Sequence, residues 1–297
     1  MSKETRLNLA IQKTGRLADE SRFLLERCGI DLLKSKDQLV CKAQNFPLDV
    51  FFVRVNDIPT FVATNACHIG IISQNILMDE QTVTMNPQLK GIQTLMELGF
   101  GRCRLSIAVP NSSEYQGIKA FEGKRIATSY QGLLREYLKE NDVNCDIVPM
   151  QGAVEIAPRM GMADAICDLV STGTTLAING LKEVEVIFES QSVLIRNSEL
   201  TTAQEELLER LMLRLKSVQV AKKSKYIMLH CPIDKLEEIK SILPGSEAPT
   251  ILALQGREDL VAVHAVCNEG VFWNTMEDLK AMGASAIMVL PIEKMLD

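Results

Sequence analysis

The segment that most constrains the fold is residues 163–176, with the sequence ADAICDLVSTGTTL. Its residues 166–170 form a short apolar run, interrupted only by Asp168, with the length and character of a buried strand. Residues 171–175 then supply four hydroxyl groups around one glycine. We therefore predict a strand, a hydroxyl-rich loop and the first turn of a helix.

The spacing of the residues alone leaves two interpretations of this loop open. Gly173 permits a tight turn, and a following helix would offer unpaired N–H groups with partial positive charge. Together with the hydroxyls, these groups would bind a phosphate dianion, and Asp168 would then hold sugar hydroxyls or a magnesium ion. No lysine follows the glycine, so the segment is not the nucleotide P-loop. Alternatively, Ser and Thr are common caps, and the same residues would simply start a helix after a strand.

Composition excludes several classes of protein. A length of 297 residues predicts two or three domains, and 46% hydrophobic with 24% charged residues is typical of a globular protein. The net charge of −6 argues against a general nucleic-acid or membrane-surface binder, so phosphorylated substrates would need local basic residues. No apolar run could span a bilayer, and residues 1–12 lack the apolar core of a signal peptide.

The eight cysteines contain no Cys-x-x-Cys pair, and the three histidines lie far apart. There is thus no zinc signature and no case for a His-based catalytic triad. We expect a reduced cytoplasmic protein with buried thiols.

Alternating strand and helix patterns fill the first 195 residues. Residues 49–75 and 146–174 both predict the order strand, helix, strand, loop. Two such α/β lobes would bind a ligand between them, at the carboxyl ends of parallel strands. One or two strands at 184–195 would return the chain to the first lobe, as in type II periplasmic-binding-protein folds. The expected strands are 6–11, 49–53, 68–72, 103–110, 146–149 and 165–170, with a further strand and its following loop within 124–130. The expected helices are 17–28, 57–65, 133–141 and 154–160.

The C-terminal part predicts a helix and then a separate domain. Thr201 and Gln204 begin a capping box, and Leu207, Leu211 and Leu215 continue an apolar helical stripe. After a boundary at 222–224 the order is βαββαβ, which gives a ferredoxin-like (ACT-like) domain. Its expected elements are 225–230, 234–243, 249–254, 260–266, 271–282 and 285–291.

These segments closely resemble ATP phosphoribosyltransferase in its long, self-sufficient form, and the resemblance covers essentially the whole chain. Its most specific part is EIAPR at 155–159 followed by residues 163–176. Further matches are QKTGRL, GKRIATSY and VLPIEKM, at 12–17, 123–130 and 289–295.

The resemblance implies a magnesium-dependent glycosyl transfer, the first step of histidine biosynthesis. Adenine N1 of ATP attacks the anomeric carbon of phosphoribosyl pyrophosphate, giving phosphoribosyl-ATP and pyrophosphate. Residues 1–104, completed by about 186–222, would form lobe I, residues 105–185 lobe II, and residues 223–297 the regulatory domain.

The match also implies residue roles. Ser171, Thr172, Gly173, Thr174 and Thr175 would bind the ribose 5-phosphate. Glu155 and Asp168 would act at the ribose and hold Mg²⁺ as catalytic residues, Lys13, Arg16 and Arg54 would neutralise phosphates, and Asn75 and Tyr130 would contact purine or ribose.

Several residues carry structural alternatives. In the structural alternative, Arg54 pairs with Asp57, Arg159 has a structural role on a helix beside Glu155, and Asp164 caps a helix or forms an ion pair at a helix end. Tyr130 fits the core as well as the cleft.

In this family the C-terminal domain binds histidine as a feedback inhibitor, and assembly moves between dimers and hexamers. The resemblance thus implies a cytoplasmic homo-oligomer with histidine and AMP as further ligands, and no nucleic-acid or membrane partner. We place the histidine contacts at Ala253, Leu254 and Asn268, within regions 248–255 and 267–271. A pure dimerisation domain is the alternative.

Two other functions fit a two-lobed chain. One is a non-catalytic solute-binding or effector-sensing protein, although neither an export signal nor a DNA-binding helix-turn-helix is evident. The other is a phosphoribosyltransferase for a different base, from which this C-terminal domain would not be expected.

Overall fold

The computed structural model describes residues 5–32, 38–83, 87–243, 248–268 and 273–296. The chain divides into two compact units, residues 1–208 and 209–297. The expected class, an α/β two-lobed unit followed by a βαββαβ domain, is confirmed.

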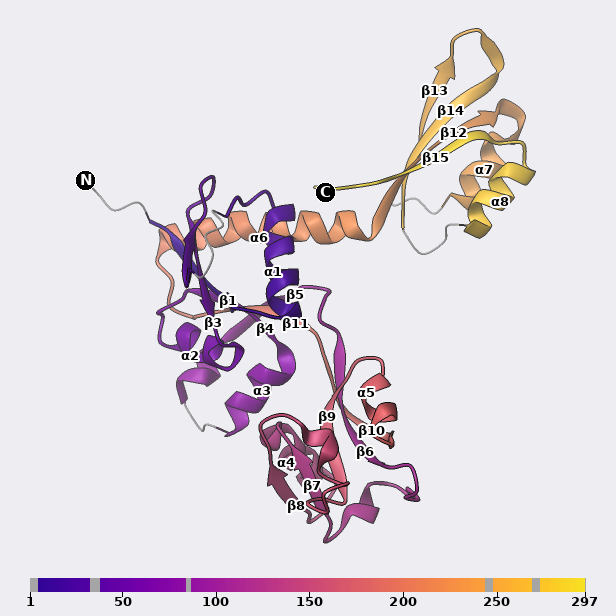
Figure 1. Ribbon diagram of the computed structural model, residues 1–297. Helices are drawn as coiled ribbons and strands as arrows, with labels where there is room; N and C mark the ends of the chain where they lie inside the picture. Colours follow the sequence, from indigo (N-terminus) through magenta and orange to yellow (C-terminus); the bar gives the residue numbers. More distant parts are fainter. Residues whose placement is uncertain (1–4, 33–37, 84–86, 244–247, 269–272, 297) are drawn as a thin grey trace. The chain divides into compact units, whose positions relative to one another are not determined.

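The first lobe is built on a six-stranded sheet with the order β2-β3-β1-β4-β11-β5 (Figure 1). Its centre is parallel, because β1 pairs in parallel with both β3 and β4. Strand β11 is antiparallel to β4 and β5, so the chain does return to this lobe, as expected. The strands are β1 Leu7–Gln12, β2 Val40–Lys42, β3 Leu48–Val53, β4 Ile69–Ser73, β5 Gln93–Glu97 and β11 Ser192–Arg196, with helices α1 Arg16–Arg27, α2 Ile58–Ala63 and α3 Gln74–Val83 and 3₁₀ turns η1 Val55–Asp57 and η2 Pro87–Gly91.

The second lobe is a five-stranded sheet with the order β10-β6-β9-β7-β8. Strand β7 is parallel to β8 and β9, whereas β6 is antiparallel to β9 and to β10. The elements are β6 Cys103–Pro110, β7 Arg125–Thr128, β8 Asp146–Pro149, β9 Ala165–Val170 and β10 Leu181–Ser190, with helices α4 Gln131–Glu140 and α5 Thr174–Ile178 and 3₁₀ turns η3 Ile118–Phe121 and η4 Val154–Ile156.

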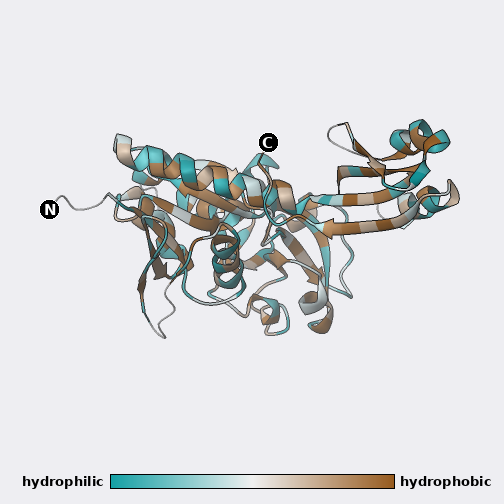
Figure 2. Cartoon of the chain, turned by 90° about the horizontal axis from the view of Figure 1, so that it is seen from above, coloured by the Kyte–Doolittle hydropathy of each residue, from teal (hydrophilic) through white to brown (hydrophobic). Residues whose placement is uncertain are grey.

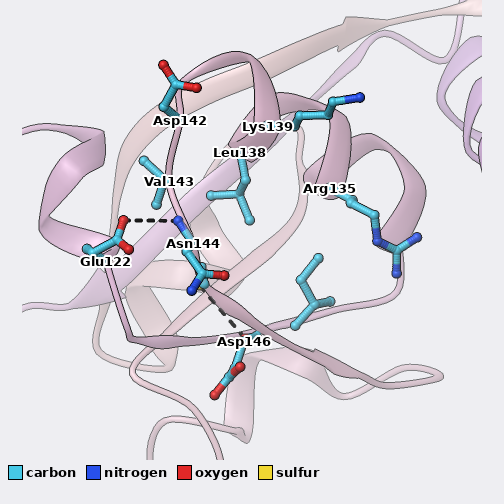
Figure 3. A pocket seen from close by; sticks show the side chains of 10 residues that line it. Glu122, Arg135, Leu138, Lys139, Asp142, Val143, Asn144 and Asp146 are labelled. Carbon is cyan, nitrogen blue, oxygen red and sulfur yellow. Dashed lines mark hydrogen bonds between the residues drawn. The ribbon is translucent and has the colours of Figure 1, made fainter.

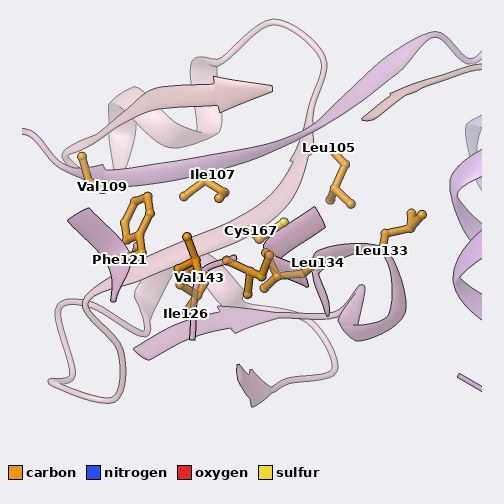
Figure 4. Close-up of a cluster of buried hydrophobic side chains, with 11 residues drawn as sticks. Leu105, Ile107, Val109, Phe121, Ile126, Leu133, Leu134, Val143 and Cys167 are labelled. Atoms are coloured by element: carbon orange, nitrogen blue, oxygen red, sulfur yellow. The ribbon is translucent and has the colours of Figure 1, made fainter. Parts of the chain in front are cut away.

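Alternation along β9 gives this sheet two buried faces. Cys167 packs with Leu105, Ile107 and Leu134 on the face covered by α4 (Figure 4). On the other face, Ile166 and Val170 pack with residues of η4 and α5, among them Val154 and Leu176. The hydroxyl loop is therefore held by a strand that is buried on both sides.

Two expected elements differ from the structure. The helix expected at 154–160 is only the 3₁₀ turn η4, because Ala153 has φ 51° before it and Pro158 supplies no N–H to extend it. A loop was expected after residue 72, but α3 begins at Gln74, directly after β4. Strands β2 and β5 are also missing from the sequence prediction.

The second unit contains the remaining sheet, with the order β13-β14-β12-β15. Leu229, Val263 and Leu279 are fully buried between this sheet and its helices. Figure 2 shows hydrophobic and hydrophilic residues alternating along the strands, the pattern of a sheet buried on one face. The elements are β12 Ser224–Pro232, η5 Ile233–Lys235, α7 Leu236–Ile242, β13 Thr250–Leu254, β14 Arg257–Asn268, α8 Trp273–Ala281 and β15 Ser285–Pro291.

The long helix α6, Thr202–Lys222, contains the boundary between the two units. The expected start of α8 at 271–272, and residues 269–271 of the expected histidine region, lie outside the described residues. In the described chain, no helix is long and apolar enough to cross a membrane.

Candidate active site

Strand β9 ends in an exposed loop that turns into α5. Gly173 has φ 80° and ψ −2°, a left-handed conformation that favours glycine, and a Cβ built there would meet no atom within 4 Å. Within the described chain, no side-chain hydrogen bond caps α5, and the first N–H groups of a helix have no intrahelical partner. The hydroxyls of Thr172 and Thr174 lie 3.0 Å apart. The loop thus presents amides and hydroxyls on an open surface.

Asp168 lies in β9, three residues before this loop, and is half-buried. One carboxylate oxygen accepts a hydrogen bond from the Leu169 N–H at 2.8 Å. Burial raises the pKa of Asp168 and the nearby charge of Glu155 adds to this, while the Leu169 hydrogen bond opposes it. Glu155, in η4, is therefore close enough to Asp168 for their charges to interact.

Tyr130 and Asn75 bring both lobes to this region. Asn75 is 0% exposed, and its Oδ1 accepts a hydrogen bond from Ser190 Oγ at 2.7 Å. The Asn75 amide also lies against Tyr130, because its hydrogen bond lowers the pKa of the Tyr130 phenol. Burial raises the pKa of the Tyr130 phenol, and the charge of Asp168 raises it further, so this hydroxyl stays neutral near pH 7. The structure thus gathers Glu155, Asp168, Tyr130 and Asn75 into one cluster.

None of the three predicted cations makes a hydrogen bond or ion pair with this cluster in the described part of the chain. Lys13 and Arg54 follow the ends of β1 and β3, whose last residues are register partners, and the Lys13 N–H donates to the Val53 carbonyl at 2.9 Å. Arg16 pairs with Glu20 at 3.1 Å. Neither Lys13 nor Arg54 makes an ion pair in the described part of the chain, so the alternative pairing of Arg54 with Asp57 is not seen. All three cations are exposed.

Asp164 has a clear structural role. It accepts a hydrogen bond from the Arg125 N–H at 2.9 Å and lies 3.6 Å from the Arg125 guanidinium, so it pairs at the start of β7 and not at a helix end. Arg159 is exposed.

The candidates in the second unit lie at strand ends. Ala253 and Leu254 belong to the edge strand β13, and Asn268 closes β14 opposite Ser224.

Residues that sequence reasoning missed line a pocket of about 730 Å³ beside the loop. Arg104 and Glu189 contribute opposite charges, and Ser171 joins this pocket to the loop. The sequence signals there were the strands expected at 103–110 and 184–195. Another pocket, of about 670 Å³, lies against α4 and β8 and is lined by both acidic and basic residues (Figure 3). It contains none of the predicted site residues.

One carboxylate joins the lobes at the start of α4. Asp79 of α3 accepts a hydrogen bond from the Leu133 N–H at 3.0 Å, and the Gly132 N–H also points to it. Burial raises the pKa of Asp79, while these two N–H groups oppose the increase.

Comparison with known proteins agrees with this architecture. The family model for ATP phosphoribosyltransferase (HisG) matches residues 54–217, and the model for the HisG C-terminal domain matches residues 221–294. A solved structure of an ATP phosphoribosyl transferase (HisG:HisZ) complex from Thermotoga maritima matches with a TM-score of 0.59 and 25% identity, over 71% of this chain and 96% of that chain.

Two binding proteins give TM-scores of 0.45. The alkanesulfonate-binding protein SsuA from Xanthomonas axonopodis pv. citri is 15% identical over 74% of each chain. The arginine-bound truncated ArgBP from T. maritima is 13% identical, over 71% of this chain and 95% of that chain. The two family models together identify the chain as a member of the ATP phosphoribosyltransferase family, glycosyltransferases of histidine biosynthesis, in its long form.

Proposed function

We propose that the loop at residues 171–175 holds the 5-phosphate of phosphoribosyl pyrophosphate while its ribose is transferred to N1 of ATP. The observation that carries this proposal is the left-handed Gly173, which turns β9 into α5 directly after Asp168. Amide and hydroxyl donors at such a turn suit a phosphate dianion. The side chain of Asp168 then lies within reach of the attached sugar.

The reaction needs charge stabilisation more than a protein nucleophile. Adenine N1 forms a bond to ribose C1 as the C1–O bond to pyrophosphate breaks, and pyrophosphate leaves with the electron pair. Positive charge develops on the ribose, and Asp168 and Glu155 supply negative charge beside it. Lys13, Arg16 and Arg54 would neutralise the phosphates.

The carboxylate pair fits a magnesium ion. Among the described residues, no group of three or more His, Cys, Asp or Glu side chains is arranged to hold a metal. Two carboxylates with substrate phosphates are, however, a common Mg²⁺ ligand set, and Asp168 and Glu155 lie close enough to couple. When bound, Mg²⁺ would neutralise charge on the leaving pyrophosphate. The Leu169 N–H holds one oxygen of the Asp168 carboxylate, which limits the orientation of the group.

Asn75 and Tyr130 are proposed to contact the purine or the ribose. The buried Asn75 Nδ2 is a donor beside the Tyr130 hydroxyl, and this neutral hydroxyl can donate or accept.

The test is substitution within the loop. Thr172→Val removes one hydroxyl, and Gly173→Val forces a β-branched residue into positive φ. We expect both to raise KM for phosphoribosyl pyrophosphate by about tenfold or more, since each removes or displaces a charge-assisted hydrogen bond. KM for ATP should change little.

Thr94→Val, at an exposed position in β5, is the matched control and should behave as wild type. Production of phosphoribosyl-ATP from ATP, Mg²⁺ and phosphoribosyl pyrophosphate is the assay. Unchanged KM for phosphoribosyl pyrophosphate in both loop variants would contradict the assignment. Turnover with another base in place of ATP would favour a different phosphoribosyltransferase, and binding without turnover a solute-binding protein.

We further propose that residues 223–297 bind histidine as a feedback inhibitor and that the protein assembles into dimers and hexamers. The match of the family's C-terminal domain model and the exposed edge strands β13 and β15 support this. Ala253, Leu254 and Asn268 remain the proposed contacts, and AMP is a further proposed ligand. Eight free thiols are consistent with a reduced cytoplasmic setting.

A further inference from the structure

A chain of hydrogen bonds reaches the hydroxyl loop from two neighbouring strands. Arg104 of β6 donates from Nη1 to the Ser171 carbonyl at 3.3 Å. Its Nε and Nη2 each donate to the Glu183 carboxylate of β10 at 2.5 Å. Ser106 Oγ donates to the same carboxylate at 2.7 Å. The first residue of the loop is thereby connected through Arg104 to β10.

Strand register places this network on the same face of the sheet as Asp168. Ser106 lies directly opposite Asp168, and Arg104 opposite Val170, in the β6–β9 ladder. Opposite residues in an antiparallel ladder point to the same face. Val170 packs there with Leu176 of α5. The network therefore supports the loop from the side that bears the proposed catalytic carboxylate.

The hydrogen bonds of this network favour the ionised form of Glu183 and restrict the orientation of Arg104. Ser106 is 0% exposed. The Arg104 guanidinium lowers the pKa of Glu183, and the Ser106 hydrogen bond adds to this effect. A bidentate guanidinium–carboxylate pair sets orientation as well as distance. Three donor positions of Arg104 are thus occupied by protein acceptors.

We infer that Arg104, held by the Glu183 carboxylate that Ser106 also binds, is a positioning residue that fixes the hydroxyl loop for phosphoribosyl pyrophosphate. This inference rests on the proposed function of the loop. Arg104 binds the Ser171 carbonyl and thereby sets the direction of the loop amides that follow it. Without it, the loop has more conformations to lose when the phosphate binds, so binding weakens while the reacting groups stay in place.

The experiment compares Arg104→Gln, Glu183→Gln and the double variant with Lys182→Gln as control. Lys182 is exposed in β10 and lies opposite Val109, one position before Glu183, so its side chain leaves the sheet on the other face. Two readouts are used. One is steady-state kinetics with ATP and phosphoribosyl pyrophosphate, and the other is hydrogen exchange, without substrates, of the Ala177 and Asn179 amides, which donate to the loop carbonyls of Gly173 and Thr175.

We expect Arg104→Gln to raise KM for phosphoribosyl pyrophosphate about tenfold, with kcat within about threefold of wild type. The Ala177 and Asn179 amides should exchange at least about fivefold faster, while those of β9 stay protected. The double variant should be no worse than Arg104→Gln, because the two residues act as one unit. Lys182→Gln should match wild type in both readouts.

Unchanged exchange of the Ala177 and Asn179 amides in Arg104→Gln would overturn the inference, as would an equal effect of Lys182→Gln. Faster exchange of these amides with unchanged KM in Arg104→Gln and in Thr172→Val would leave the positioning role standing and overturn the assignment of the loop to phosphate. A kcat loss with unchanged KM and unchanged exchange would overturn the positioning role and place Arg104 in the chemistry.

Discussion

Burial raises the pKa of the Asp168 carboxyl, and the charge of Glu155 raises it further, while the Leu169 N–H acts in the opposite direction. The folded protein therefore holds a carboxylate whose charged form is disfavoured at that position. Such a residue is retained where function requires the charge. The same residue should consequently reduce the stability of the fold.

Asp168→Asn should separate these two effects. A raised folded pKa means that the contribution of Asp168 to stability is present below the unfolded pKa, about 4, and is lost as pH rises through the folded value. The variant should therefore gain stability relative to wild type between pH 4 and 7, with Tm higher by about 1–3 °C at pH 7. Turnover should fall by at least about a hundredfold. Thermal unfolding across this pH range, with Glu140→Gln at an exposed position of α4 as control, checks the prediction; a lower Tm of Asp168→Asn at pH 7 would contradict it.

At the residue scale, the loop and its carboxylate were predictable, but their supports were not. Asp168 and Gly173 stand out because a charge in an apolar run and a glycine among hydroxyls are local signals. The pairing of Arg104 with Glu183 depends on the register of β10 against β6, which contains two irregularities. No local pattern encodes that register. The proximity of Asn75 to Tyr130 likewise depends on how the two lobes meet.

At the scale of elements, α3 and α4 form the contact between lobes. Tyr130 occupies the N-cap position of α4 without making a side-chain cap, and Asp79 of α3 accepts the Leu133 N–H instead. Gly132 permits this approach, because a Cβ there would lie 2.9 Å from Thr82 Cβ and 3.0 Å from the Asp79 carbonyl oxygen. One lobe thus caps a helix of the other.

Three variants test this contact. Asp79→Ala should cost about 1 kcal/mol, the usual value of an N-cap. Asp79→Asn keeps an acceptor and removes a charge that burial disfavours, so it should match or exceed wild-type stability at pH 7. Because the folded pKa of Asp79 is raised, the stability of wild type relative to Asp79→Asn should fall as pH rises from about 4 through that value. Gly132→Ala should destabilise although alanine favours helices. Circular-dichroism melts report all three, and equal losses in Asp79→Asn and Asp79→Ala at every pH would refute the cap.

Element prediction succeeded where periodicity was strong and local. The ends of β6, β8 and β9 were predicted to the residue. It failed at 154–160, where the apolar spacing of a helix was present but Pro158 and the left-handed Ala153 limit the segment to one turn. It also missed the edge strand β5, whose residues are largely exposed and so carry no apolar alternation.

At the scale of the whole molecule, two units have separate cores. Leu229 and Val263 centre the core of the second unit, whereas the lobes of the first unit have cores of their own. The boundary between the units falls within α6, so a cut at residue 208 would divide a continuous helix. A cut after Lys222 keeps the helix whole.

Deletion of residues 223–297 should therefore leave a folded fragment that turns over ATP and phosphoribosyl pyrophosphate, with both KM values within about threefold of wild type. Histidine inhibition should be lost, because histidine can act only through a site that remains. The oligomer should also become smaller, since the deleted domain is proposed to contribute to assembly. The deletion also removes the hydrogen bond from the Met295 N–H to the Ser217 carbonyl, so any local loosening is expected in α6.

Ala253→Arg in the full chain tests the same proposal without deletion, since this exposed edge position accepts a long side chain. Both variants are tested by titrating their activity with histidine and by measuring their mass with light scattering. Inhibition that persists in a folded 1–222 fragment would place the histidine site in the catalytic lobes. Full inhibition of Ala253→Arg would place the site away from β13.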